Sequence, residues 1–145
     1  MPRLINTPTD WPCISVAYDQ SLSTMKKSGR IRKYFRFNKY FMDFLRNDNP
    51  QLNIIYRSAK VVVDEENHLI GFKFFVGKKE GDFPLSHNKK GHMSMAAHKI
   101  LDNYDWSKEI HLRHIEDRKF FPYRFTDDEG KEIWVIELDK PGRRG

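Results

Sequence analysis

The sequence predicts an α+β fold that is mainly antiparallel β, with a barrel-like or two-sheet core and two short helices. Three observations predict it. Short apolar segments rich in β-branched and aromatic residues recur along the chain and are separated by polar turns. Two of these turns, at 64–67 and 126–130, are acidic and join pairs of such segments, as in hairpins. Helical patterns are short, and 145 residues with 39% apolar composition suffice for one domain.

The first half is expected to run from a coil through two strands and a helix into a hairpin. Residues 1–12 carry three prolines, which deny backbone donors and favour a lead-in coil. Asn38 is the expected N-cap of the helix, which the turn-forming residues at 47–50 end. The elements are expected as a strand at 13–18, a loop at 19–29, a strand at 30–37, a helix at 39–45, and strands at 52–56, 59–63 and 69–76.

The second half is expected to repeat this order. Its elements are expected as an extended piece at 82–85, a basic loop at 86–91, a helix at 93–104 with Ser94 as N-cap, a connection or strand at 110–115, and hairpin strands at 120–125 and 132–138. The repeated order predicts an internal duplication, with units at about 24–76 and 82–139 inside one compact domain at 13–140. A plain α+β domain with two common hairpins is the alternative. Residues 141–145 are expected to form a flexible basic tail.

Three groups of residues in the first half resemble a known family. They are Gly29, Arg30 and Ile31 before the strand, then Phe37, Asn38, Lys39 and Leu45 around the helix, and 61–74 in the hairpin. On these residues the chain resembles the AbrB-type swapped-hairpin family, and two units in one chain are similar to the tandem arrangement of MraZ-type regulators. The resemblance implies one barrel built from two units. The second half has no Gly-Arg-Ile, and Asn38 stands near the place where the family often has Pro. The element order is also similar to small proteins of phages and mobile elements.

Charge is distributed unevenly along the chain, whose formal net charge is +6. Residues 24–60 carry ten basic and two acidic residues, whereas 101–139 carry six basic and eleven acidic ones. The basic half predicts contact with nucleic-acid phosphates, with DNA favoured over RNA. The alternative is a solvated edge strand whose charges prevent aggregation. The expected contact residues are Lys26, Lys27, Arg30, Arg32, Lys33, Arg36, Lys39, Lys89 and Lys90.

Aromatic residues are interleaved with these charges. Tyr34, Phe35 and Phe37 could stack on bases where they are exposed. Because neighbouring side chains of a strand point to opposite faces, only one set of them can be exposed while the other lies in the core.

Catalysis finds little support in the sequence. The six histidines lack the spacing of a tetrahedral metal site, and the acidic runs at 64–66 and 127–129 are typical of hairpin turns. Cys13 is interpreted as a buried structural cysteine, and no glycine-rich phosphate loop is present. We therefore expect no catalytic residue, no cofactor and no metal. A metal nuclease using Asp64, Glu65 and a histidine is the remote alternative.

These observations predict a non-enzymatic, nucleic-acid-binding regulatory protein. The alternative is a protein-interaction module or inhibitor of a host protein, encoded by a phage or mobile element, that uses its acidic second half. The chain has no apolar run that could span a membrane and no apolar stretch near Met1 typical of a signal peptide. A cytoplasmic protein without membrane contact, present as a monomer or homodimer, is expected.

Overall fold

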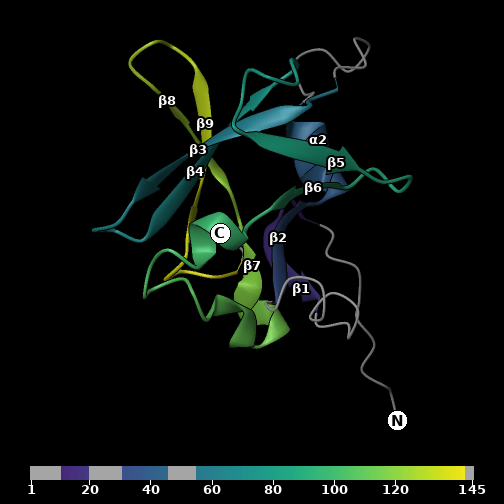
Figure 1. Cartoon of the computed structure of the whole chain (residues 1–145). Coiled ribbons are helices and arrows are strands. Elements are labelled where there is room, and N and C mark those ends of the chain that lie inside the picture. Colours follow the sequence, from purple (N-terminus) through teal and green to yellow (C-terminus); the bar gives the residue numbers. More distant parts are fainter. Residues whose placement is uncertain (1–10, 20–30, 46–54, 143–145) are drawn as a thin grey trace.

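The fold is a curled antiparallel sheet with two short helices (Figure 1), as a computed structural model describes it for residues 11–19, 31–45 and 55–142. Its elements are β1 Ile14–Asp19, β2 Arg32–Phe37, α2 Lys39–Leu45, β3 Ser58–Asp64, β4 Leu69–Phe75, β5 Phe83–His87, β6 Met93–Ala96, α3 His98–Leu101, the 3-10 turns η2 Ile110–Leu112 and η3 Ile115–Arg118, β7 Lys119–Phe120, β8 Tyr123–Thr126 and β9 Glu132–Glu137. The predicted fold class is confirmed.

The described strands form one sheet in the order β7-β1-β2-β6-β5-β3-β4-β9-β8, and every named strand pair is antiparallel. The first and last strands of this order, β7 and β8, are separated in the chain by Phe121 and Pro122 alone. The sheet therefore curls around its core until its two ends meet at these residues. We call β7-β1-β2-β6-β5 the first wall and β3-β4-β9-β8 the second wall.

The strand pairing has a two-fold symmetry. Exchanging β1, β2, β3 and β4 with β5, β6, β7–β8 and β9 leaves the pairing scheme unchanged: β1·β2 becomes β5·β6, β3·β5 becomes β7·β1, and β3·β4 becomes β8·β9. The pairs β2·β6 and β4·β9 each join two corresponding strands. Each half also places a short helix after its second strand. The described strands thus pair in a two-fold pattern that includes β1, and the internal duplication itself stays a prediction.

Aromatic side chains fill the space between the two walls. Phe37 on β2 meets Phe72 and Phe74 on β4 edge to face, with ring centroids 5.2 and 5.3 Å apart. Phe35 contacts Phe72 in the same way at 5.0 Å, and Phe41 of α2 joins them. Phe35, Phe37, Phe41 and Phe72 are fully buried. Each edge-to-face pair adds to the hydrophobic effect of burial, so these contacts hold the walls together.

The expected helix at 93–104 is wrong except at His98–Leu101, since 102–104 form a turn and a bend. Met93–Ala96 forms β6, because Met93 and Met95 alternate into the core while the strand pairs with β2. Ser94 lies on the outer face of that strand and caps no helix; the helix α3 spans only His98–Leu101. Pairing with β2 thus overrides a segment that could also form a helix.

Other expected boundaries also change. The expected strand at 120–125 is split into β7 and β8, because Pro122 lies between them and has no backbone donor. Residues 110–115 contribute to two 3-10 turns, and residues 55–57 lie outside any strand, so the strand expected at 52–56 does not reach 56. The tail expected from 141 is partly ordered, since Gly142 donates to the carbonyl of Lys119 at 2.7 Å. Residues 20–29, 47–50 and 52–54 lie outside the described residues.

Asn38 is the N-cap of α2, as the sequence predicts. Its Oδ1 accepts hydrogen bonds from the backbone N–H groups of Phe41 and Cys13, each at 3.0 Å. Its Nδ2 donates to the carbonyl of Trp11 at 2.7 Å. Because Asn38 is buried, these bonds satisfy polar groups that have lost water. One side chain thus fixes both the start of α2 and the start of β1.

Replacing Asn38 with alanine leaves two N–H groups and one carbonyl without their partner. We expect the Asn38→Ala variant to lose about 1–3 kcal/mol of unfolding free energy, measured by urea denaturation followed by tryptophan fluorescence. Asn38→Asp keeps the acceptor and is expected to lose less. An alanine variant as stable as the wild type would show that the cap does not stabilise this fold.

Candidate nucleic-acid interface

A row of polar side chains crosses the outer face of the first wall. Direct cross-strand partners share a face of the sheet, so the register places one residue of each strand in line. The row runs from β7 to β5 through Lys119, Ser15, Arg36, Ser94 and Ser86. Four of these strands thus contribute a hydroxyl or cationic group beside Arg36, the central member, which is exposed.

Strand alternation decides which residues of β2 reach this face. Phe35 and Phe37 point into the core, so Arg32, Tyr34 and Arg36 point outward. Two expected contact residues, Arg32 and Arg36, therefore lie on the outer face of the first wall. The exposed guanidinium of Arg32 lies 5.9 Å from the ring centroid of Tyr34.

The β5–β6 turn adds further cations beside β2. Asn88 holds the turn, because its Oδ1 accepts hydrogen bonds from the backbone N–H groups of Lys90 at 3.0 Å and His92 at 2.9 Å. Gly91 adopts a φ of 89°, which glycine tolerates best, and a Cβ at this position would lie 3.5 Å from Cβ of Lys39. The turn thus brings Lys90 to the same hollow as Lys39 at the start of α2. Both lysines are exposed, as is Lys89 in the same turn.

The second half of the chain supplies two cations that sequence reasoning missed. Arg118 and Lys119 belong to the segment with an acidic balance, yet β7 pairs with β1 and carries them to the first wall. Arg118 donates to the carbonyls of Val16 at 2.8 Å and Arg113 at 3.1 Å, and Lys119 lies 3.3 Å from a carboxylate oxygen of Glu116. No local pattern at 118–119 indicates this placement, because it depends on pairing with a strand about 100 residues earlier.

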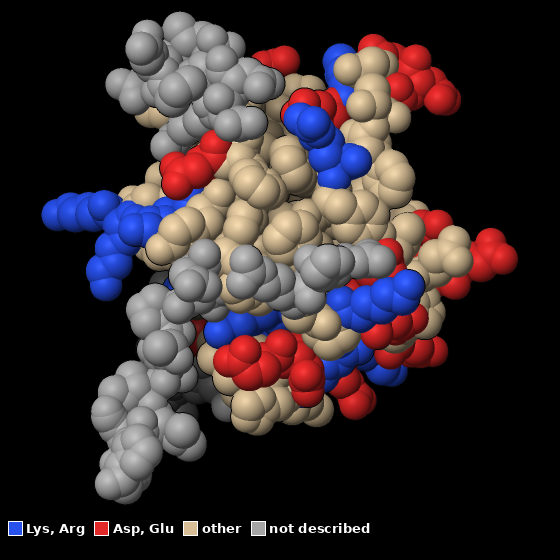
Figure 2. Space-filling model, turned by 180° about the vertical axis from the view of Figure 1, so that it is seen from behind, with Lys and Arg blue, Asp and Glu red and all other residues tan. Residues whose placement is uncertain are grey.

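Two adjoining hollows form the candidate site, which we call the basic groove. One has a volume of about 500 Å³ and the other about 770 Å³, and both are lined by Arg36 and His92. Together their linings hold six Lys and Arg residues and one carboxylate, Asp19. Figure 2 shows Lys and Arg side chains extending together from one side of the molecule, beside an uncharged area. The cations of the groove are Arg32, Arg36, Lys39, Lys90, Arg118 and Lys119.

The pKa of His92 reflects its burial and the positive charge around it. Burial lowers its pKa below the usual range, and repulsion from Arg36, Lys90 and Lys39 lowers the pKa further. Within the described residues, Nδ1 of His92 is buried without a hydrogen-bond partner. The groove therefore disfavours an additional cation and favours an anion.

Lys33 does not lie on this face, so its prediction as a nucleic-acid contact is wrong. It lies on the inner side of β2 with 5% of its surface exposed. Its ammonium forms an ion pair with Asp102 at the end of α3 and donates to the carbonyl of Lys108 at 2.7 Å. Lys33 thus anchors α3 and the following loop to β2. Lys26, Lys27 and Arg30, the other expected contact residues, lie outside the described residues.

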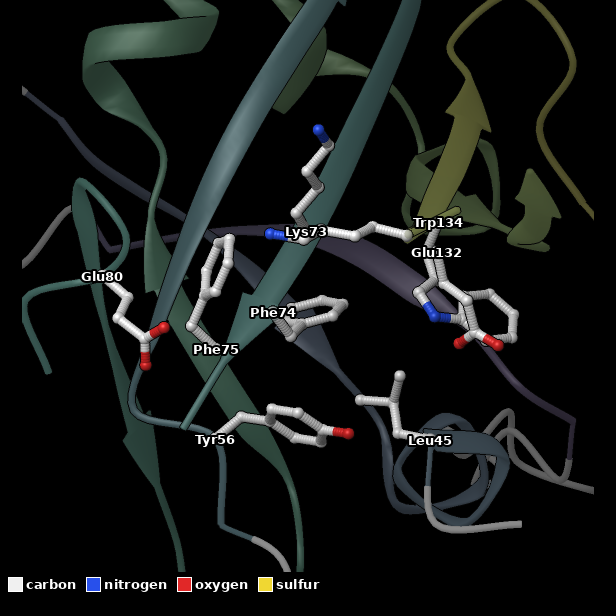
Figure 3. A pocket seen from close by; sticks show the side chains of 9 residues that line it. Leu45, Tyr56, Lys73, Phe74, Phe75, Glu80, Glu132 and Trp134 are labelled. Atoms are coloured by element: carbon white, nitrogen blue, oxygen red, sulfur yellow. The ribbon is translucent and has the colours of Figure 1, made fainter. Parts of the chain in front are cut away.

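A second pocket, of about 330 Å³, lies among α2, β4 and β9 (Figure 3). The side chains of Leu45, Tyr56, Phe74 and Trp134 gather at its apolar part. Two lysines and two glutamates balance its charge, and three of these four form an ion pair or hydrogen bond within the protein. These three contacts are Lys73 with Asp127 at 2.7 Å, Glu80 with the N–H of Gly77 at 2.8 Å, and Glu132 with Arg124 at 3.0 Å. This pocket therefore offers less to a charged ligand than the basic groove does.

The centre of the outer face of the second wall is apolar. Val62, Gly71, Ile133 and Phe125 line a shallow hollow of about 330 Å³ there, and about half of the Phe125 surface is exposed. A Cβ on Gly71 would lie within 3 Å of both Val62 and Ile133, so glycine lets these side chains close over β4. The two walls thus present different chemistry to solvent.

Neither a metal cluster nor a membrane-spanning helix is found in the described part of the chain. No three His, Cys, Asp or Glu side chains there lie close enough together to hold a metal ion. No helix among those residues has the length and apolar character needed to cross a bilayer. Cys13 is buried, which raises the pKa of its thiol to about 12 and opposes formation of the reactive thiolate.

Comparison with known proteins found no matching family model, no matching curated protein and no matching solved structure. The resemblance to the AbrB-type swapped-hairpin family therefore stays a prediction from the sequence.

The position of Lys33 predicts a structural effect. Lys33→Met keeps the aliphatic chain but removes the ammonium that contacts Asp102 and the carbonyl of Lys108. We expect a loss of about 1–3 kcal/mol in urea denaturation, whereas Lys99→Met, at an exposed position of α3, leaves stability unchanged. Equal stability of the two variants would contradict the anchoring role.

The lowered pKa values of His92 and His111 predict how stability depends on pH. For His111 the causes are burial and then Lys33 and Arg118, opposed by Asp102 and Glu109. Both rings bind protons less readily in the folded protein than in the unfolded chain, so stability decreases as pH falls through the ordinary histidine range near 6.5.

We expect urea midpoints to decrease from pH 7.5 to pH 5.5, a window above the titration of the carboxylates. The His92→Asn, His111→Asn double variant should lose less of its stability over the same window. A double variant with the same pH dependence as the wild type would assign the effect to other groups.

Proposed function

We propose that this protein is a nucleic-acid-binding regulatory protein that contacts phosphates through the basic groove on the outer face of the first wall. The observation that carries the proposal is the convergence of six cations from β2, α2, the β5–β6 turn, η3 and β7 on one groove, where Asp19 is in the lining and Glu116 pairs with Lys119. Neutralising phosphates with such cations releases condensed counterions and drives binding. The serines in the row beside Arg36 can add hydrogen bonds to phosphate oxygens.

The shape of the surface supports the proposal as well as its charge. The two hollows adjoin through Arg36 and His92, so a polyanion can follow them continuously across the strands. A compact anion would occupy only one of the two hollows, whereas a polyanion can occupy both. A cytoplasmic location, where nucleic acid is accessible to the protein, belongs to the same proposal.

The protein-interaction alternative uses the acidic second half, and the turn at 127–129 carries three of the eleven carboxylates at 101–139. Asp127 of this turn is engaged within the molecule: Lys73 lies 2.7 Å from its carboxylate, and its Oδ1 accepts from the N–H groups of Lys131 and Glu129. These contacts lower the pKa of Asp127 and tie the turn to the second wall. The turn thus has a structural role, and the basic groove takes precedence as the proposed function.

Reversing charge in the groove tests this proposal. We expect the variant Arg36→Glu, Lys39→Glu, Lys90→Glu to lose binding to labelled oligonucleotides in fluorescence anisotropy. The slope of log affinity against log salt should become shallower by about one for each phosphate contact removed.

The matched control is Lys60→Glu, Lys78→Glu, Lys131→Glu, which changes net charge equally at exposed positions outside the groove. It should retain most of the wild-type affinity and slope. Equal losses in both variants would indicate a general charge effect, and binding that survives reversal of the groove would overturn the proposed surface. Both variants must first show the urea transition of a folded protein.

A further inference from the structure

Tyr34 is the outward-facing aromatic residue of β2, and its surroundings across the strands are small. In register it lies opposite Ala17 on β1 and Ala96 on β6. Both neighbours on the same face therefore carry only a methyl group. Tyr34 is partly exposed and lines the 500 Å³ hollow of the basic groove. A flat ligand can thus approach its ring without meeting a bulky side chain from the adjacent strands.

Cations flank Tyr34 along its own strand. Arg32 and Arg36 lie two residues before and after it, so all three side chains share the outer face. The Arg32 guanidinium lies 5.9 Å from the ring centroid. The aromatic ring therefore stands between two positive charges, of which Arg32 lies opposite Asp19 of β1 and Arg36 opposite Ser15. This arrangement fits a planar group carried between two anionic ones, with Arg36 the cation that has no acidic cross-strand partner among the described strands. A nucleotide strand has this chemistry, because each base is joined to a backbone with a phosphate on either side.

The position of Tyr34 on the surface of a sheet favours unpaired bases over a duplex. A duplex hides its base faces in the stack, and proteins read it by inserting a helix or a ribbon into a groove. Here the ring lies on the surface of a sheet, within a shallow hollow whose lining comes from four neighbouring strands and the β5–β6 turn. Sheets with exposed aromatic rings and nearby cations bind single-stranded nucleic acids by stacking.

We infer that Tyr34 stacks on an unpaired base of a single-stranded nucleic acid whose neighbouring phosphates lie on Arg32 and Arg36. The inference rests on the proposed function and specifies the form of nucleic acid that the groove takes. Phe35 and Phe37 are fully buried and take no part in it. Because every base has an aromatic face, the stacking tolerates different bases. Unpaired bases are the shared chemistry of single-stranded DNA and RNA.

The test compares single strands that carry the same number of phosphates with and without bases, and adds a duplex whose bases are paired. Labelled 12-mers of thymidine, of uridine, of abasic deoxyribose and of duplex DNA are titrated with the protein in fluorescence anisotropy at fixed salt. We expect the wild type to bind the thymidine or the uridine 12-mer about tenfold more tightly than the abasic one, since stacking contributes only where bases are present. The duplex should bind no better than the abasic strand. The tighter-binding of the thymidine and uridine strands shows whether the DNA or the RNA homopolymer is preferred.

Three variants connect the effect to Tyr34. Tyr34→Leu should reduce the affinity for base-containing strands to that for the abasic strand and leave the abasic affinity unchanged. Tyr34→Phe should retain the preference for bases. Phe125→Leu removes an exposed aromatic ring from the second wall and should change nothing.

A wild type that binds all strands equally, or a Tyr34→Leu variant that keeps the preference for bases, would overturn the stacking while leaving the basic groove intact. Tighter binding of the duplex than of either base-containing strand would overturn it as well. If none of the probes shows salt-dependent binding, the proposed function itself is refuted. Unfolding midpoints of the variants, compared with the wild type, separate lost stacking from lost structure.

Discussion

The packing of β2 against β4 is the contact on which the rest of the structure depends. Phe35 and Phe37 meet Phe72 and Phe74 in the middle of the core, and the two walls of the sheet face each other across these rings. Because side chains alternate along a strand, burying the phenylalanines fixes the outward direction of the neighbouring side chains. Tyr34 and Arg36 must point outward, so the same packing that stabilises the fold creates the basic groove.

The two-fold topology explains why the groove lies where it does. The first wall is centred on the pairing of β2 with β6, and the second on the pairing of β4 with β9. Each central pair consists of corresponding strands from the two halves, but their outward residues differ. Arg36 faces Ser94 across the first pair, whereas Gly71 faces Val135 across the second. A symmetric framework thus carries a polar cationic face at the centre of one wall and an apolar one at the centre of the other.

Much of the architecture was predictable because it depends on local patterns. The strand at β2, the N-cap Asn38, the helix α2 and both acidic hairpins follow from alternation, capping and turn residues that lie close together in the chain. The segment at Met93–Ala96 was not predictable in the same way. Its two buried methionines fit either a helix or a strand, and only the edge offered by β2 decides between them.

The sequence by itself determined that this protein is rich in short antiparallel strands, that its basic residues cluster in the first half, and that the side chains of β2 alternate between two faces of which only one can be exposed. Local periodicity and composition carry this information. Tertiary structure alone decided which cations act together. It buried Lys33 against Asp102, and it brought Lys119 from the acidic half beside Ser15 and Arg36. The physical reason is that strand pairing joins residues far apart in the chain, and no local pattern encodes the partner of a strand.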